Sequence, residues 1–376
     1  MSPPTSEFSL PADLLPSDGR FGPGPSKVRP EAVAALAAAG RDYLGTSHRQ
    51  AGVRFMVAAL RNGVSELLEL PDGYEVALGN GGTTAFWDAA TFGLIEQRSQ
   101  HLSFGEFSAK FAACAAAAPH LDVPEVIESA PGTHPEPKAS PDVDAYCLTH
   151  NETSTGVAMA LARPEGGEGL VLVDGTSAAG GLRFDASQVD AYYFAPQKCL
   201  ASDGGLWIAV LSPAAVERIE RIRASGRWTP AFLDLAIALE NSRKDQTYNT
   251  PALATIHLAV SQVQWVLDNG GMPWAAARCD RSAEVVYGWA EASDYARPYV
   301  ADPADRSHVV ATIDLDDAVP AATVSSILRA NGVVDTEGYR KLGRNQLRVA
   351  LFPAIEPDDV AALTRCIDVI AARSGS

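Results

Sequence analysis

Residues 75–95, EVALGNGGTTAFWDAATFGLI, contain the pattern that decides the fold. Residues 75–78 form a short run typical of a strand, residues 79–84 form a glycine-rich loop, and residues 85–95 have the composition of a helix. A strand that leads through a glycine loop into a helix is the unit from which parallel α/β sheets are built. This stretch therefore predicts an α/β protein.

The same alternation continues along the chain. Further strands are predicted at residues 143–148, 170–173, 191–194 and 206–211. Helices are predicted at residues 30–40, 53–70 and 251–267. Because helical stretches separate several of the strands, we expect a large domain with a mostly parallel central sheet covered on both faces.

Asn269-Gly270-Gly271 marks a predicted domain junction. Beyond it, shorter units alternate: a helix at 273–292, a strand at 309–313, a helix at 321–330, a strand at 346–351 and a helix from 357. Before residue 21 the chain is rich in Pro and Ser, which favours an extended arm. The predicted organisation is an arm at 1–20, a large domain at 21–268 and a smaller α+β domain at 269–376.

The charge balance limits the partners that we expect. The chain has 30 Lys+Arg against 46 Asp+Glu, a net charge of −16, which disfavours binding to nucleic acid or to an anionic membrane. The arginine-rich run at 217–223 is interpreted as a solvated helix face. Five scattered cysteines indicate neither a metal site nor a disulfide framework. Without a signal segment or a transmembrane run, we expect a cytoplasmic protein that acts on small molecules.

Reactive side chains follow the predicted strands at their carboxyl ends, where open α/β sheets bind ligands. Asp174 ends one strand, Lys198 follows another, and the glycine loop before the helix can bind a phosphate. Each feature alone has a plainer explanation, as a cap, a surface lysine or a turn. Together they match the needs of pyridoxal 5′-phosphate: an amine for a Schiff base, an acid for the pyridine nitrogen and donors for the phosphate.

Several motifs of this chain occur together in one known family. They are FGPGPSKV at 21–28, TSHRQ at 46–50, GNGGTTAFWDA at 79–89, HNETSTG at 150–156, FAPQKCLASDGGLW at 194–207 and YNTPALATI at 248–256. With them the chain resembles the phosphoserine aminotransferases of the actinobacterial type, class V members of the fold type I pyridoxal phosphate enzymes. The resemblance extends from about Phe21 through the C-terminal helix and implies that fold and that cofactor.

The resemblance implies a role for each residue at the cofactor. Lys198 would bind the cofactor covalently and shuttle a proton, and Asp174 would pair with the pyridine nitrogen. Thr153 would bind the phenolic oxygen, and Phe107 would stack on the ring where many relatives have a tryptophan. The residues implied at the phosphate are Gly82, Thr83 and Gln197 and, from the neighbouring subunit, Asn249 and Thr250. The active site would thus be completed by a homodimer.

The resemblance also implies the substrate contacts. Arg348 would bind the α-carboxylate, since a guanidinium suits a carboxylate bidentately. The distal anion of the substrate would be bound by His48, Arg49 and Arg340. Thr83 stands where some relatives have an arginine. The nearby Arg344 is the candidate to compensate for that missing cation.

The implied reaction transfers an amino group between L-glutamate and 3-phosphohydroxypyruvate, giving O-phospho-L-serine and 2-oxoglutarate. Some relatives also act on 4-phosphohydroxy-L-threonine in pyridoxine synthesis. The alternative is a sister class V enzyme such as an alanine–glyoxylate aminotransferase, against which His48 and Arg49 count because it needs no distal anion site. An oxidoreductase that binds NAD is disfavoured because the loop at 79–84 lacks the dinucleotide fingerprint. A cofactor-free binding protein is disfavoured by the presence of both Asp174 and Lys198.

Overall fold

The computed structural model describes residues 8–374. A seven-stranded sheet with the order β1-β9-β8-β7-β4-β2-β3 forms the centre of the large domain. Its strands are β1 (Glu75–Asn80), β2 (Ser99–Ser103), β3 (Glu125–Glu128), β4 (Ala145–Thr149), β7 (Leu170–Asp174), β8 (Ala191–Phe194) and β9 (Leu206–Leu211). Strands β8, β7, β4, β2 and β3 are parallel, whereas β9 runs antiparallel to both β8 and β1. The prediction of an α/β fold with a mostly parallel sheet is confirmed.

Helices cover both faces of this sheet. One face carries α1 (Pro30–Tyr43), α2 (Ala51–Leu67) and α7 (Leu253–Asp268), and the other carries α3 (Thr83–Gly93), α4 (Glu106–Ala117), α5 (Pro213–Ala224) and α6 (Leu235–Ser242). Every residue of β7 is buried, as expected of a strand covered on both sides. Its alternate side chains belong to different cores: Val171 and Val173 face α2, and Leu170 and Leu172 face α3 and α4.

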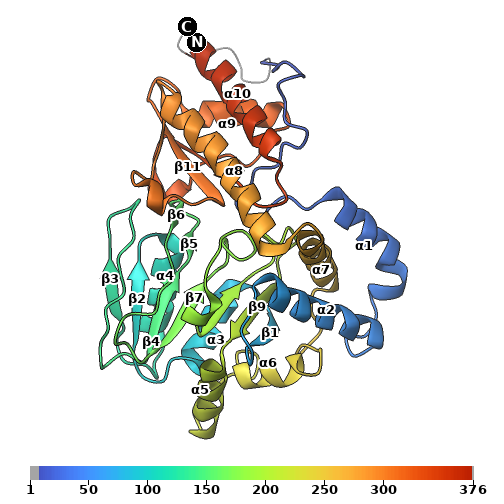
Figure 1. Ribbon diagram of the computed structural model, residues 1–376, viewed down its shortest axis with the longest axis vertical. Helices are drawn as coiled ribbons and strands as arrows, with labels where there is room; N and C mark the ends of the chain where they lie inside the picture. The colour runs from blue at the N-terminus through green and yellow to red at the C-terminus, as the bar shows by residue number, and fades with distance from the viewer. Residues whose placement is uncertain (1–7, 375–376) are drawn as a thin grey trace.

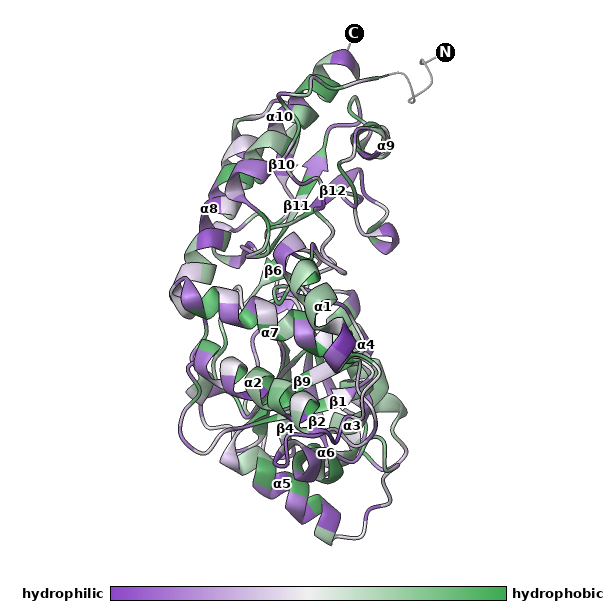
Figure 2. Cartoon of the chain, turned by 90° about the vertical axis from the view of Figure 1, so that its right-hand side faces the viewer, coloured by the Kyte–Doolittle hydropathy of each residue, from purple (hydrophilic) through white to green (hydrophobic). Residues whose placement is uncertain are grey.

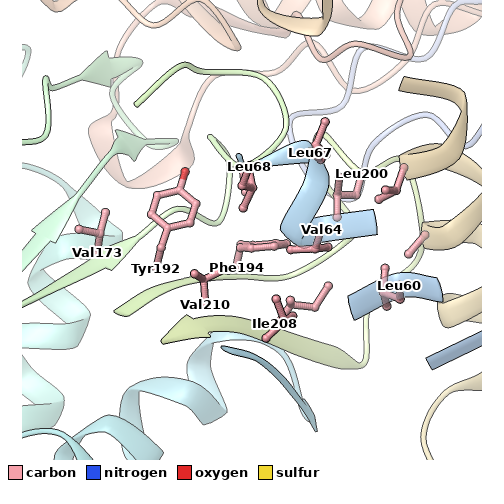
Figure 3. Close-up of a cluster of buried hydrophobic side chains, with 14 of the residues drawn as sticks. Leu60, Val64, Leu67, Leu68, Val173, Tyr192, Phe194, Leu200, Ile208 and Val210 are labelled. Atoms are coloured by element: carbon pink, nitrogen blue, oxygen red, sulfur yellow. The ribbon is translucent and has the colours of Figure 1, made fainter. Parts of the chain in front are cut away.

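Helix α2 shows why these segments fold as they do. Its buried residues recur every three to four positions, at Val53, Val57, Leu60, Val64 and Leu67. Figure 3 shows Leu60, Val64 and Leu67 of this stripe near side chains of the sheet, among them Tyr192, Phe194, Ile208 and Val210. In Figure 2 helices such as α2 carry both hydrophobic (green) and hydrophilic (purple) residues, as expected of a helix with one buried and one exposed side.

A smaller domain follows, drawn in orange to red in Figure 1. It contains α8 (Gly271–Ala292), β10 (Ala296–Pro298), β11 (Val310–Leu315), α9 (Ala321–Ala330), β12 (Gln346–Ala350) and α10 (Pro357–Ser374). Its three strands form an antiparallel sheet. The described part of the predicted arm packs on this domain: Leu10 is buried in its core and Ser17 donates a hydrogen bond to Asp359. The residue limits of the domains stay a prediction.

Strand β2, helix α4 and strand β3 were not anticipated from the sequence. The sequence of β2, SQHLS, is polar, yet its first four residues are buried. Gln100 is satisfied there by the carboxylate of Glu125 (3.0 Å) and by the carbonyl of Lys138 (2.8 Å), and His101 contacts Ser99 (2.9 Å). A buried strand with satisfied polar side chains has no apolar run by which a sequence pattern would reveal it.

No helix within residues 8–374 is long and apolar enough to cross a membrane.

The interpretation of residues 217–223 as a solvated face is wrong for Arg218. Its side chain is 8% exposed, and its guanidinium binds the carboxylate of Asp144 (3.0 Å) and the carbonyl of Leu94 (2.9 Å). The Asp144 carboxylate also accepts hydrogen bonds from the backbone N–H groups of residues 96–98. Arg218 therefore ties α5 to the segment between α3 and β2.

Two substitutions on α5 separate a buried cation from an exposed one. Arg218→Ala should lower the free energy of unfolding by about 3 kcal/mol, because the Asp144 carboxylate loses its buried partner. Arg221→Ala removes a half-exposed arginine that pairs with Glu96 (2.6 Å), and should cost only about 0–1 kcal/mol. Urea unfolding followed by circular dichroism measures both values. Equal costs would contradict the buried role of Arg218.

Candidate active site

The carboxyl ends of β1, β8, β7 and β4 meet at one edge of the large sheet, beside the start of β9. There the Gly81 N–H donates to the Gly205 carbonyl (3.0 Å). A cavity of about 380 Å³ opens at this edge. The predicted site residues that line it are Gly82, Thr83, Phe107, Thr153, Asp174, Gln197 and Lys198.

Lys198 lies on the loop after β8 with its side chain almost fully buried. Its amine donates a hydrogen bond to the carbonyl of Pro23 (2.6 Å), and its carbonyl accepts one from the Ser26 hydroxyl (2.6 Å). Burial, and next the cation of Arg348, lower the pKa of Lys198 to about 8. A lysine with this pKa is partly neutral near pH 7, and the neutral amine is the form that attacks a carbonyl.

Asp174, at the end of β7, faces the same cavity. One carboxylate oxygen accepts bonds from the Thr176 N–H (2.9 Å) and hydroxyl (2.5 Å), and the other accepts from the Trp87 indole N–H (3.2 Å). Burial raises the pKa of Asp174 to about 6, although these hydrogen bonds act in the opposite direction. A carboxylate that is costly to ionise in this way favours a cationic partner within the cavity.

The glycine loop ends at the first turn of α3. Gly82 precedes the helix with φ +78°, a left-handed conformation that favours glycine. The first N–H groups of a helix have no partners inside it, and the helix dipole attracts anions to them. Thr83, the first residue of α3, also lies 2.9 Å from the Thr176 hydroxyl that contacts Asp174. The start of α3, which can bind an anion, is thus linked through Thr176 to the carboxylate of Asp174.

The remaining wall comes from the segment after β4. The Thr153 hydroxyl donates to the Ser177 hydroxyl (2.7 Å), which the Asn151 amide also contacts (2.8 Å). The side-chain oxygens of Asn151 and Gln197 are buried and have no hydrogen-bond partner within residues 8–374. A buried amide oxygen without a hydrogen-bond partner is unfavourable, and a polar ligand in the cavity would supply one. The residues therefore fit a polar ligand, and specifically a phosphorylated ring with a basic nitrogen.

A second cavity of about 470 Å³ shares Gly24 and Pro25 with the first. Both predicted substrate residues of the small domain, Arg340 and Arg348, line it. Arg348 donates to the carbonyl of Thr153 (3.1 Å), its guanidinium lies 5.2 Å from the centre of the Tyr339 ring, and its Nε has no hydrogen-bond partner among the described residues. Arg348 can therefore bind a carboxylate close to Lys198.

Four predicted residues form a separate cluster. The Thr250 hydroxyl contacts His48 Nδ1 (3.2 Å), Arg49 donates to the Gln246 side chain (3.1 Å), and Asn249 accepts from Asn80 (2.8 Å). None of the four lines the cavity of Lys198 or that of Arg348. Asn80, however, directly precedes Gly81 and Gly82, which line the cavity of Lys198. Their predicted roles at the phosphate and the distal anion remain predictions.

Within the described chain, Arg344 lines neither of these two cavities and does not contact the cluster of His48, Arg49, Asn249 and Thr250. It forms an ion pair with the buried carboxylate of Asp314 (2.5 Å), and its guanidinium lies 4.7 Å from the centre of the Tyr299 ring. The prediction that Arg344 compensates for the missing arginine at position 83 finds no support in this geometry. Residues 8–374 also hold no cluster of His, Cys, Asp and Glu that could bind a metal ion.

Several residues of the site were missed by the sequence interpretation. Thr176 and Ser177 come two and three residues after Asp174, and their position after a strand end was the available signal. Trp87 belongs both to the core and to the cavity wall: it is 5% exposed, packs near Phe111 and donates a hydrogen bond to Asp174. Glu152, which follows a predicted strand inside the HNETSTG motif, was given no role, because its partners Phe107 and Ser108 on α4 are distant in the sequence.

Comparison with known proteins adds independent findings. The family model described as aminotransferase class-V matches residues 21–341. A protein of Rhodococcus jostii named phosphoserine aminotransferase is 58% identical over 99% of this chain and 100% of its own length. The crystal structure of a phosphoserine aminotransferase from Cytophaga hutchinsonii superimposes with a TM-score of 0.87 at 24% identity, covering 94% of this chain and 99% of that one.

The raised pKa of Asp174 predicts how stability depends on pH in the ligand-free protein. The folded pKa of about 6 lies above the ordinary 3.8, so the folded state holds an extra proton in this interval and loses stability as pH rises through it. The loss is on the order of 3 kcal/mol. Asp174→Asn should remove this contribution, so the change in urea unfolding free energy from about pH 4 to pH 7 should be more favourable than that of the wild-type protein by on the order of 3 kcal/mol. An equal change in the two proteins would show that Asp174 makes no such contribution.

Proposed function

The chain belongs to the class V aminotransferases, and on that basis we propose that it transfers an amino group between L-glutamate and 3-phosphohydroxypyruvate, giving O-phospho-L-serine and 2-oxoglutarate. The cofactor is pyridoxal 5′-phosphate. The observation that carries the proposal is that Lys198, Asp174 and the start of α3 face one cavity, while Arg348 faces the adjoining one.

The chain's own residues divide the work at the cofactor. When bound, the cofactor supplies an electron sink that acidifies the α-hydrogen of the amino acid. Lys198 would hold the cofactor through its amine and would move the proton released from the α-carbon, which its lowered pKa favours. Asp174 would pair with the ring nitrogen and favour its protonated form. The first turn of α3 holds the phosphate, and Thr153 orients the ring through its phenolic oxygen.

Arg348 orients the substrate. Its guanidinium binds the α-carboxylate and is itself held by the Thr153 carbonyl and the Tyr339 ring. This contact places the α-carbon near Lys198, because Arg348 is close enough to lower the lysine pKa. Arg340, in the same outer cavity, faces the distal phosphate or carboxylate.

The proposal includes a homodimer in the cytoplasm. His48, Arg49, Asn249 and Thr250 gather beside one another but line neither the cavity of Lys198 nor that of Arg348 in their own chain, so we assign them to the site of the neighbouring subunit. Two large apolar side chains lie close to them in the sequence and face solvent: Phe55 is 71% exposed and Tyr248 is 48% exposed. A second copy of the chain that covers these side chains would bring the four residues to its own cavity.

The two half-reactions test the substrate. Glutamate alone should remove the visible absorption of the bound cofactor, and a suitable keto acid should restore it. We expect 3-phosphohydroxypyruvate to restore it at least about tenfold more efficiently than pyruvate or glyoxylate, since a bound phosphate adds charge-assisted hydrogen bonds. Efficient recovery with glyoxylate instead would indicate an alanine–glyoxylate aminotransferase. Including the keto acid of 4-phosphohydroxy-L-threonine asks whether that substrate is also used.

Mixed dimers test the shared active site. Lys198→Ala and Arg49→Ala should each be nearly inactive toward 3-phosphohydroxypyruvate when refolded alone. If Arg49 serves the partner's site, co-refolding equal amounts should restore roughly a quarter of the wild-type activity, because half of the dimers then contain one intact site. No recovery in dimers verified by mass would place Arg49 and Lys198 in the same subunit's site. Each variant refolded alone is the control.

A further inference from the structure

Glu152 is a fully buried carboxylate that the reaction described above does not use. It lies in the short strand β5 (Asn151–Glu152), which pairs with β6 (Val157–Ala158), between the pocket residues Asn151 and Thr153. No Lys, Arg or His of residues 8–374 forms an ion pair with it. A buried carboxylate without a cation must be stabilised by hydrogen bonds.

Both carboxylate oxygens of Glu152 are occupied by donors. Oε2 accepts from the Phe107 N–H (3.1 Å), the Ser108 N–H (2.9 Å) and the Ser108 hydroxyl (3.0 Å). Oε1 accepts from the N–H (3.1 Å) and the hydroxyl (2.7 Å) of Ser154. The Phe107 and Ser108 N–H groups belong to the first turn of α4, where a helix lacks internal partners and its dipole favours a negative charge. Glu152 thus caps α4 from a different part of the chain.

Gly105 allows this close approach. A Cβ atom at this position would lie 2.3 Å from Glu152 Cγ and 2.4 Å from its Cδ, so α4 begins directly against the carboxylate. The Glu106 N–H donates to the Ser154 hydroxyl (3.0 Å), which adds a second link between the two segments. The start of α4 therefore has one position relative to the segment 151–154.

This arrangement connects residues with distinct tasks in the site. Phe107 presents its ring to the cavity from the turn that Glu152 caps, and Thr153 follows Glu152 in the chain. Arg348 is held by the Thr153 carbonyl. We propose that Glu152 is a positioning residue, whose carboxylate fixes the ring-stacking Phe107 relative to Thr153 and Arg348. The inference rests on the proposed function, because it assigns these three residues to the cofactor and the substrate.

Glu152→Gln tests this role with little change in shape. The glutamine amide must turn its NH₂ toward one set of N–H donors, so that either α4 or Ser154 loses its acceptor. In the cofactor-free protein, hydrogen exchange of a peptide that covers Phe107 and Ser108 should become roughly tenfold faster or more. The dissociation constant for pyridoxal 5′-phosphate should rise about tenfold, and the visible circular dichroism of the bound cofactor should weaken. The value of kcat should fall more than KM rises, since the ring and not the carboxylate contact is displaced.

Asp144→Asn is the matched control. Asp144 also caps backbone N–H groups, at residues 96–98, but it stands at the start of β4, whereas Glu152 follows the end of that strand. Its substitution should lower thermal stability and leave the cofactor affinity and the circular dichroism at wild-type values. Ser154→Ala, which removes a single partner of Glu152, serves as a milder variant and should shift the same signals in the same direction.

The outcomes distinguish a failure of the positioning role of Glu152 from a failure of the proposed substrate. Wild-type dichroism and affinity in Glu152→Gln, or equal losses in Glu152→Gln and Asp144→Asn, would overturn the positioning role. A Glu152→Gln chain that does not fold leaves the decision to Ser154→Ala, for which unchanged cofactor signals would also overturn it. Failure of the wild-type protein to convert 3-phosphohydroxypyruvate would instead overturn the proposed substrate, and the cofactor signals of Glu152→Gln would still report on the positioning role.

Discussion

The buried carboxylate of Asp174 is the constraint on which the site depends. It ends a strand whose five residues are all buried, at the centre of the sheet, so water cannot solvate the charge. Thr176 and Trp87 offset part of the cost of ionisation, yet the pKa of Asp174 stays raised to about 6. A protonated ring nitrogen removes this cost by pairing with the carboxylate. The unfavourable free energy of ionising the buried Asp174 therefore favours binding of a ligand with a protonated ring nitrogen.

The second constraint is that the site joins two separately packed cores. The residues that we propose contact the cofactor come from strand ends of the large domain, and Arg348 comes from β12 of the small domain. Direct bonds fix the two parts to each other at the cavity: Arg348 to the Thr153 carbonyl, the Thr312 hydroxyl to the Thr155 carbonyl (2.8 Å), and Lys341 to Glu106. All three contacts involve the segment 152–156 or the start of α4, the two segments that Glu152 connects.

The sequence allowed the sheet and the cofactor pocket to be predicted because both depend on local patterns. Apolar runs identified β4, β7, β8 and β9, and Asp174, Lys198 and the glycine loop, which follow predicted strands, were expected to converge, as they do at the first cavity. Phe107, Thr153 and Gln197 were expected there from the family resemblance. Strand β2 escaped because polar residues such as Gln100 are buried there with partners distant in the sequence. Arg218 and Glu152 escaped for the same reason: whether a charged residue is buried depends on a partner that only the fold brings near.

The distal anion site follows from which cations are free to reach the outer cavity. Position 83 is a threonine, and Arg344 is committed to the buried Asp314. Lys341 lines the outer cavity but pairs with Glu106, and Arg348 is the residue that we propose binds the α-carboxylate. Among the cations of residues 8–374 that line the outer cavity, Arg340 then remains for a phosphate of charge near −2, which a single exposed guanidinium binds weakly. Under the proposed function the missing positive charge comes from the partner subunit, so that recognition of a phosphorylated substrate would depend on the proposed homodimer.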